Sequence, residues 1–304
     1  MSARTDRLSY LGYRVGAAVA NALPVPVASV LAAGAGAGFS RALKGRRTML
    51  ARHLRRVYGD GLSEAQLDAK VAQAFDSYAK YWLESFRLGS TGHDALEAGM
   101  SWEGVARVDE ALAAGNGVIM AMPHLGGWDF GAAWLASAGF PATVVVEALE
   151  PRELFEWFVS LREAMGLTVV PHGPEAGTAV LRALRANEIV GLVADRDLAR
   201  NGIEVEFFGE RTTLPAGPAT LALRTGAVLL PCAIYFAERG HHGVVRPPVD
   251  TSRSGSFRDD VGRVMQAFAH ELEHLIRRAP EQWHLMQPNW PSDYELIAAA
   301  PTSP

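Results

Sequence analysis

The sequence is poor in cysteine: Cys232 is the single one in 304 residues. One cysteine cannot form an internal disulfide, so a reducing compartment fits best. Cys232 lies within the apolar run 228–235, where a small buried hydrophobe is a better interpretation than a nucleophile. The sequence also lacks an excess of positive charge: it has 29 basic and 33 acidic residues, which give a net charge of −4. This balance argues against nucleic acid as a partner.

The N-terminal region lacks the run of about 20 uninterrupted apolar residues that a membrane-spanning helix needs. Residues 15–40 carry no charge, but Asn21, Pro24 and Pro26 interrupt them. We therefore expect two short apolar helices that are separated at residues 24–26. A signal peptide is not indicated, because no clear cleavage site is followed by a polar mature start.

A run of basic residues without an intervening acid follows this apolar segment. Its members are Arg41, Lys44, Arg46, Arg47, Arg52, Arg55 and Arg56. This order suits a peripheral protein on the anionic, cytoplasmic face of the cell membrane, at about 1 kcal/mol per basic residue near the surface. The alternative is a solvated helix face. We expect residues 1–60 to form membrane-facing helices within one domain that spans residues 1–304.

The rest of the sequence predicts alternating strands and helices after a helical region at residues 1–90. The expected strands are 117–122, 142–147, 167–170, 189–194, 203–208, 227–235 and 242–246, and the expected helices are 108–114, 127–138, 152–165, 177–186, 217–225 and 257–278. Such alternation predicts an α/β fold, with a mostly parallel central sheet of about six to seven strands flanked by helices. Ligands of these folds bind at the carboxyl ends of the strands.

His124 follows the expected strand 117–122, and Asp129 falls in the first turn of the next helix. The helix dipole favours a carboxylate there, and Gly126 and Gly127 let the backbone turn tightly. We expect Asp129 to reach back to the imidazole, fix its tautomer and raise its basicity. Such a base can take a proton from an alcohol that attacks a carbonyl. A lone histidine at a strand end can equally be a structural residue.

A second acidic group, Asp195-Arg196-Asp197, follows the expected strand 189–194. In a parallel sheet this group emerges at the same edge as His124, so Asp195 is a candidate to contact the imidazole. The alternative is a loop ion pair with Arg196. No serine or cysteine nearby has the pattern of a nucleophile elbow, which favours direct transfer without a covalent enzyme intermediate.

Several stretches together resemble the lysophospholipid and lipid A late acyltransferase superfamily, whose signature is His-x4-Asp. More narrowly, the sequence resembles the actinobacterial phosphatidylinositol mannoside acyltransferases. The matching stretches are residues 77–88, 123–129, 194–198, 202–209, 215–218 and 283–288. The resemblance therefore covers most of the chain from residue 77 to residue 290.

The resemblance implies an acyl-CoA-dependent enzyme that acts on a glycolipid. A fatty acyl group, often palmitoyl, would move to the 6-hydroxyl of the mannose on inositol C2 of a phosphatidylinositol mannoside. It also implies His124 as the base, Asp129 as its support and Arg162 as an active-site arginine, whereas the family usually has glutamate at the position of Asp195. No metal or further cofactor is expected. The remaining candidates for substrate binding are Gly126 and Gly127 as backbone oxyanion donors, together with Arg196 and Glu147.

Three other functions remain open. The chain could acylate another lipid acceptor, such as a lysophospholipid or other glycolipid, or it could bind membrane lipid without catalysis. The third alternative is a zinc hydrolase, because residues 270–274 read His-Glu-Leu-Glu-His. Glu273 places a charge where zinc-protease helices are usually apolar, and no clear third ligand motif is present, so this alternative is the weakest.

Overall fold

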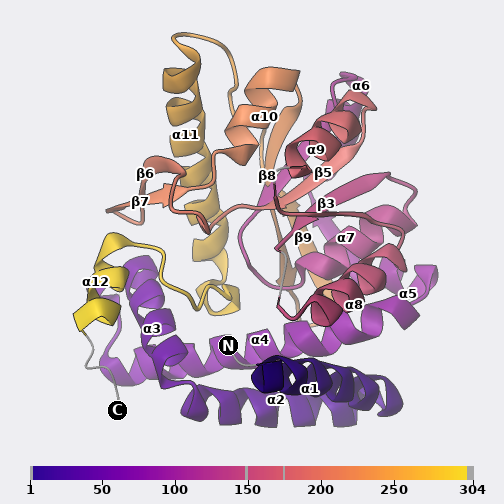
Figure 1. Cartoon of the computed structure of the whole chain (residues 1–304), viewed down its shortest axis with the longest axis vertical. Helices are drawn as coiled ribbons and strands as arrows, with labels where there is room; N and C mark the ends of the chain where they lie inside the picture. Colours follow the sequence, from indigo (N-terminus) through magenta and orange to yellow (C-terminus); the bar gives the residue numbers. More distant parts are fainter. Residues whose placement is uncertain (1–2, 148–149, 174, 300–304) are drawn as a thin grey trace.

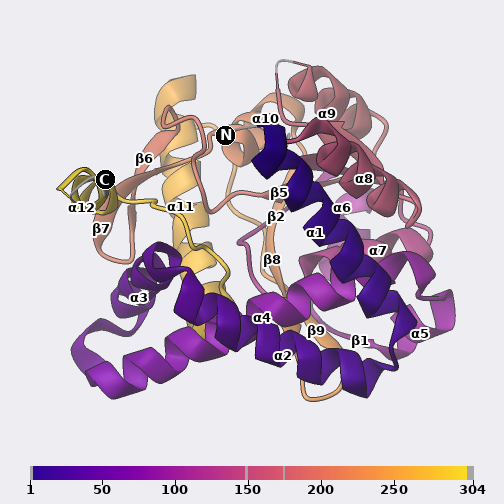
Figure 2. The ribbon, with the colours of Figure 1, turned by 60° about the horizontal axis from the view of Figure 1, so that its bottom comes forward.

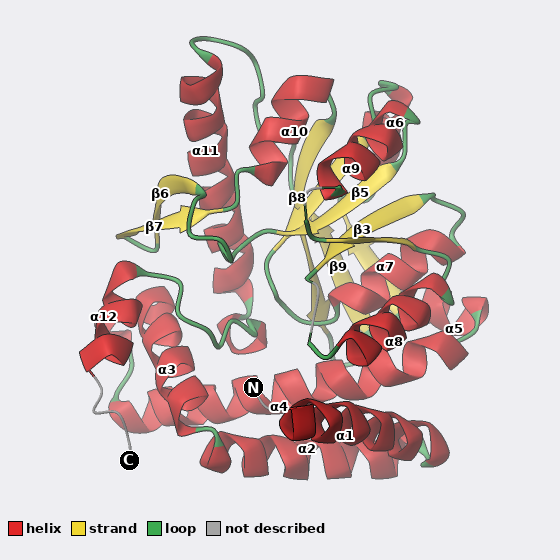
Figure 3. Ribbon diagram, viewed as in Figure 1, coloured by secondary structure: helices red, strands yellow, loops and turns green. Residues whose placement is uncertain are grey.

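The computed structural model describes residues 3–147, 150–173 and 175–299, so both ends of the expected unit 1–304 lie outside the described residues. The described residues form a seven-stranded sheet in the order β1-β9-β8-β2-β5-β3-β4, with helices on both faces (Figures 1 and 3). Its strands are β1 (Met100–Glu103), β2 (Val118–Met122), β3 (Ala142–Val146), β4 (Thr168–Pro171), β5 (Ile189–Val193), β8 (Val228–Phe236) and β9 (His241–Val245).

Neighbouring strands of this sheet are parallel except for β8 and β9, which form an antiparallel pair. The predicted fold class is therefore confirmed. The helices that follow the first strand are α6 (Ala106–Ala113), α7 (Trp128–Ser137), α8 (Arg152–Glu163), α9 (Ala176–Arg185), α10 (Gly217–Thr225), α11 (Phe257–Arg278) and α12 (Pro291–Ala299). Each of the six helices expected in this region is present, with bounds within two residues of the prediction.

Two details of the strand prediction are wrong. The edge strand β1 was not expected, because four residues of mixed polarity give almost no pattern. The strand expected at residues 203–208 does not join the central sheet: β6 (Ile203–Phe207) pairs with β7 (Glu210–Leu214) in a separate antiparallel hairpin. The alternation of polar and apolar residues along β6 is typical of an antiparallel strand with one exposed face.

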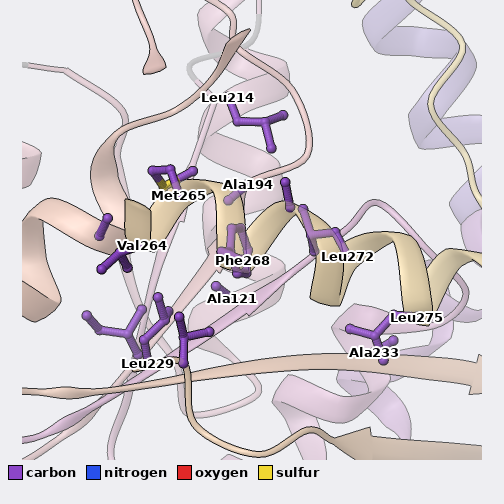
Figure 4. Close-up of a cluster of buried hydrophobic side chains, with 14 of the residues drawn as sticks. Ala121, Ala194, Leu214, Leu229, Ala233, Val264, Met265, Phe268, Leu272 and Leu275 are labelled. Carbon is purple, nitrogen blue, oxygen red and sulfur yellow. The ribbon is translucent and has the colours of Figure 1, made fainter. Parts of the chain in front are cut away.

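The core lies on both faces of β2, the central strand. Ile119 and Ala121 pack toward α9, α10 and α11, whereas Val118 and Met120 pack toward α6 and α7. Figure 4 shows the first of these layers around the fully buried Phe268, whose burial stabilises the fold by roughly 2–3 kcal/mol.

Cys232 of β8 is part of this core. Its side chain is fully buried, and burial raises the pKa of its thiol to about 12. The interpretation as a small buried hydrophobe is confirmed, because the thiolate that a nucleophile requires does not form at neutral pH.

The N-terminal region forms a helical layer below the sheet in the view of Figure 1. It contains α1 (Ala3–Ala22), α2 (Val25–Ala42), α3 (Lys44–Tyr58), α4 (Glu64–Arg87) and a short α5 (His93–Ala98). The break between α1 and α2 lies at Pro24, as the prolines predicted, and Figure 2 shows α1 crossing in front of α4. In the part of the chain that the structure describes, no helix combines the length and apolarity that a bilayer crossing requires.

The basic run divides into two groups in the structure. Arg47, Arg52, Arg55 and Arg56 form ion pairs with acidic residues, and the fully buried Asp293 of α12 binds both Arg52 and Arg56. Arg41, Lys44 and Arg46 are exposed, and none of them has an acidic partner within the described residues. About half of the run therefore serves the fold, because distant segments supply acids that the local sequence lacks.

Candidate active site

The register of two central strands brings His124 and Asp195 together. β2 and β5 are parallel and Met122 lies opposite Val193, so the residues two positions further along each chain emerge side by side. A hydrogen bond of 2.6 Å joins Nδ1 of His124 to Oδ1 of Asp195, and the backbone N–H of His124 donates to Oδ2 over 3.0 Å. Asp195 therefore contacts the imidazole directly.

Asp195 is fully buried, yet its surroundings favour the charged carboxylate. The indole N–H of Trp283 donates to Oδ2 over 2.7 Å. Burial raises the pKa of Asp195, but the charge and hydrogen bonds of His124 and the bond from Trp283 outweigh it, so the pKa lies below its usual value. An ionised Asp195 accepts a hydrogen bond from Nδ1–H of His124, which fixes the tautomer and leaves Nε2 as the basic nitrogen.

The Nε2 side of His124 faces accessible space. The side chain is 34% exposed, and its ring stands perpendicular to that of Trp128, with 5.7 Å between ring centroids. Nε2 has no hydrogen-bond partner among the described residues. An imidazole with one nitrogen held and the other free has the geometry of a general base.

Asp129 does not contact His124, contrary to the expectation from sequence. Its carboxylate accepts two hydrogen bonds from Arg162 of α8, from Nε over 3.1 Å and from Nη2 over 2.9 Å. The hydroxyl of Tyr81 on α4 donates a further bond of 2.9 Å, and Ser85 adds a longer one of 3.4 Å. Two helices that are distant in sequence thus supply the partners, and Asp129 anchors Arg162 and α4 at the site.

The backbone amides of Gly126 and Gly127 are already engaged, so neither is available as an oxyanion donor. Gly126 N–H donates to the carbonyl of Gln282 and Gly127 N–H to that of Ile234, each over 2.9 Å. Gly126 has a φ of +62°, and a Cβ there would lie 2.0 Å from the carbonyl oxygen of Ile234. The glycines serve close backbone packing, which the sequence pattern did not reveal.

Arg196 and Glu147 form an ion pair with each other at 3.7 Å. They follow β5 and β3 respectively, and their side chains are 23% and 49% exposed. The loop ion pair considered for Arg196 is thus made with Glu147, while Asp197 accepts the N–H of Gly202 over 2.7 Å. A pair with this exposure contributes little to stability, so both side chains can reorient toward a ligand.

Sequence reasoning treated His284 as structural and missed its position against His124. Its backbone N–H donates to the carbonyl of His124 over 2.7 Å, and its Nε2 lies 2.8 Å from the hydroxyl of Ser77. Burial, and to a smaller extent the charge of His124, lowers the pKa of His284 to about 3. The second imidazole is therefore neutral at physiological pH. Its place in the family-like stretch 283–288 was the signal that could have found it.

The residues of the His-Glu-Leu-Glu-His pattern hold α11 in place. Glu271 accepts a hydrogen bond of 2.6 Å from Arg246, and Glu273 accepts the N–H of Phe208 over 2.6 Å. His270 pairs with Gln266 on the same helix. Within residues 3–147, 150–173 and 175–299, no group of three or more His, Cys, Asp or Glu side chains has the arrangement of a metal site.

Comparison with known proteins agrees with this geometry. The model of the bacterial lipid A biosynthesis acyltransferase family matches residues 3–292, nearly the whole chain. The chain belongs to this acyltransferase family. The match includes both β2 and β5, whose ends carry His124 and Asp195.

Individual relatives of this acyltransferase are similar in sequence over most of the chain. A phosphatidylinositol mannoside acyltransferase of Mycolicibacterium smegmatis is 38% identical over 286 residues, which cover 93% of this chain and 91% of the relative. One of Mycobacterium tuberculosis is 40% identical over 231 residues, covering 74% and 72% of the two chains. A lipid A biosynthesis acyltransferase of Haemophilus influenzae is 25% identical over 229 residues, covering 73% and 68%.

Proposed function

We propose that this acyltransferase moves a fatty acyl group from acyl-CoA to the mannose 6-hydroxyl of a phosphatidylinositol mannoside. The observation that carries the proposal is the His124–Asp195 pair, with a free Nε2 at the carboxyl edge of the sheet. The acceptor is supported by the names and the coverage of the two mycobacterial relatives.

The reaction proceeds within a ternary complex. Nε2 of His124 takes the proton of the mannose hydroxyl as its oxygen attacks the thioester carbonyl, and Asp195 stabilises the resulting imidazolium. The tetrahedral anion then collapses, the carbon–sulfur bond breaks, and the imidazolium returns its proton to the CoA thiolate. A new ester and free CoA are the products, without a covalent enzyme intermediate. Arg196 and Glu147 flank the strand ends and bind the polar parts of the substrates.

The first carbons of the donor's acyl chain enter a narrow apolar cavity beside this site, which is too small for a whole palmitoyl chain. The cavity has a volume of about 80 Å³, and Trp128, whose ring contacts that of His124, is one of the residues that line it. Strands β2, β3 and β5 line it with Met122, Val144 and Gly191 among others. An apolar lining favours a hydrocarbon chain over water.

The enzyme acts as a peripheral protein on the anionic cytoplasmic face of the cell membrane, and its helical N-terminal layer makes the contact. Support comes from exposed apolar side chains on α1 and α2, such as Val15, Val30 and Phe39. The exposed Arg41 and Lys44 follow them and lack acidic partners among the described residues. This combination of exposed apolar side chains and basic charge is typical of helices that lie in a membrane interface.

Mass spectrometry of reaction products tests the proposal. Purified protein is incubated with palmitoyl-CoA and either mannosylated phosphatidylinositol, unmannosylated phosphatidylinositol or a lysophospholipid. We expect one added palmitoyl group on the mannosylated lipid alone, with fragmentation placing it at the mannose 6-position. Acylation of the lysophospholipid instead would overturn the acceptor. Lipid binding without transfer, unaffected by His124→Gln, would support a non-catalytic lipid-binding protein and overturn the activity.

A further inference from the structure

A large cavity of the protein lies outside the catalytic centre. It is an apolar groove of about 530 Å³ among α1, α2 and α4. Gly36 sets α2 tightly on α4, because a Cβ there would lie 3.0 Å from the carbonyl oxygen of Phe75. Val19, Leu31, Phe39, Trp82, Phe86 and Met286 are among the residues that line the groove. Its size lies in the range of about 300–1,000 Å³ that small-molecule sites occupy.

One part of the groove is polar and positively charged. Arg46 lines the groove, is exposed, and has no acidic partner within the described residues. Burial raises the pKa of the Tyr13 hydroxyl to about 12 and also raises that of Tyr78, and the nearby Arg46 partly offsets both effects. A guanidinium beside two protonated hydroxyls matches a phosphate group, which prefers charge-assisted hydrogen bonds.

We propose that this groove binds one acyl tail of the acceptor lipid and that Arg46 binds the phosphate of the same molecule. The inference rests on the proposed function, because it assigns the lipid anchor of that acceptor. The ligand is thus an anionic diacyl glycerophospholipid of the phosphatidylinositol type. Apolar walls with a basic residue beside them match a lipid tail that is joined to a phosphodiester. A neutral lipid matches the apolar walls alone, and an acidic peptide matches the basic residue alone.

The position of the groove relative to His124 supports this assignment. Tyr78 lines the groove and its ring contacts that of His284, with 5.4 Å between centroids. The His284 ring in turn lies 5.8 Å from Trp128, which stands 5.7 Å from His124. A layer of aromatic rings therefore separates the groove from the base. The inositol and mannose of the acceptor extend across this layer, so the tail and the reacting hydroxyl occupy separate sites.

Direct binding of a soluble phospholipid tests the groove without any turnover. Dihexanoyl phosphatidylinositol, kept monomeric, is titrated into the full chain in an isothermal calorimeter. Ala79→Trp fills the groove from α4, whereas Ala72→Trp adds the same side chain at an exposed position of that helix. We expect the dissociation constant to rise at least about tenfold for Ala79→Trp, because the indole excludes methylenes of the lipid tail from the groove. For Ala72→Trp it should stay unchanged. Equal affinities of the two variants overturn the proposal.

A charge-matched pair of variants tests the phosphate contact. Arg46→Gln removes the groove cation, and Arg55→Gln removes a cation on the same helix that is paired with Glu64 outside the groove. We expect Arg46→Gln to weaken the binding of dihexanoyl phosphatidylinositol about tenfold. The binding of dihexanoyl glycerol, which lacks phosphate, should stay unchanged. Equal losses for both arginine variants indicate a general attraction of the anionic ligand to the basic surface of the protein and overturn the role of Arg46.

Turnover separates failure of this inference from failure of the proposed function. With palmitoyl-CoA and a mannosylated phosphatidylinositol in vesicles, Ala79→Trp is expected to raise the acceptor KM about tenfold, and Ala72→Trp to match wild type. Should wild type transfer nothing while the calorimetric difference persists, the proposed acceptor chemistry fails and the groove remains a phospholipid site. Should wild type transfer normally with equal KM values in both variants, the groove assignment fails alone.

Discussion

The short hydrogen bond between His124 and Asp195, 2.6 Å from Nδ1 to Oδ1, follows directly from the pairing of two parallel strands. Met122 and Val193 are the last paired residues of β2 and β5, and the two site residues come just after them. Asp195 also accepts the backbone N–H of His124 and the indole N–H of Trp283. One carboxylate that accepts three hydrogen bonds thus fixes the orientation of the imidazole.

Asp195→Asn is expected to lower kcat by about 10³-fold, because the amide selects the wrong tautomer of His124. Two donors converge on Oδ2, so the amide oxygen of Asn turns toward them. Its NH₂ then faces Nδ1, which must accept, and Nε2 carries the proton. Steady-state kinetics and the melting temperature measure the effect. Trp283→Phe removes a single donor to Asp195, so its kcat should fall less. Equal kcat values for Asp195→Asn and Trp283→Phe would contradict the tautomer argument.

Asp129→Ala is expected to lower the free energy of unfolding by about 3 kcal/mol or more, because it leaves the Arg162 guanidinium uncompensated. The side chains of this ion pair are only 8% and 17% exposed. Urea denaturation measures the change. The double replacement Asp129→Leu with Arg162→Met removes both charges and is expected to recover most of the loss. A single variant as stable as wild type would show that this pair does not hold α8 at the site.

Lowering the pH from about 6.5 to 4.5 is expected to destabilise the protein through His284, by up to about 1.4 kcal/mol per pH unit. Burial lowers the folded-state pKa of His284 to about 3, below the unfolded value of about 6.5. In this window the unfolded chain binds a proton that the folded chain does not, so stability falls with pH. Chemical denaturation at several pH values should show a flatter profile for His284→Gln. The exposed His172→Gln is the control, and identical profiles for both variants contradict the assignment.

Gly191→Val is expected to shift the preference of the enzyme toward shorter acyl donors. Gly191 lines the apolar cavity, and a Cβ there would lie 3.2 Å from Cγ1 of Val144 on the neighbouring strand. A valine fills space that the first carbons of the chain would occupy, so the kcat/KM ratio of palmitoyl-CoA to acetyl-CoA should fall about tenfold. Both donors are compared on the same acceptor. An unchanged ratio would show that the acyl chain lies elsewhere.

The sequence sufficed for the parts of the site that depend on strand order and parallel pairing. The turn after β2 places His124, and the end of β5 places Asp195, because parallel strands end at one edge of the sheet. The helices could also be predicted, because each of them buries one stripe of apolar residues that recurs with helical periodicity. The antiparallel strand β9 does not disturb this edge.

The partners of Asp129 could not be predicted in the same way. Its spacing from His124 suggested contact, but Arg162 and Tyr81 approach it from α8 and α4, and no local pattern specifies how these helices cross the sheet. The amides of Gly126 and Gly127 were misjudged similarly, because their carbonyl partners belong to distant segments. Local sequence also hid Asp293, which binds two arginines of the basic run.

Acyl transfer by His124→Gln tests the central claim most directly. Glutamine fills a similar volume but cannot act as a base, so the rate from palmitoyl-CoA to mannosylated phosphatidylinositol should fall about 10²–10⁴-fold. The melting temperature is measured in parallel and should stay close to that of wild type, because the side chain is 34% exposed. A folded His124→Gln protein that transfers palmitate at the wild-type rate would contradict the account.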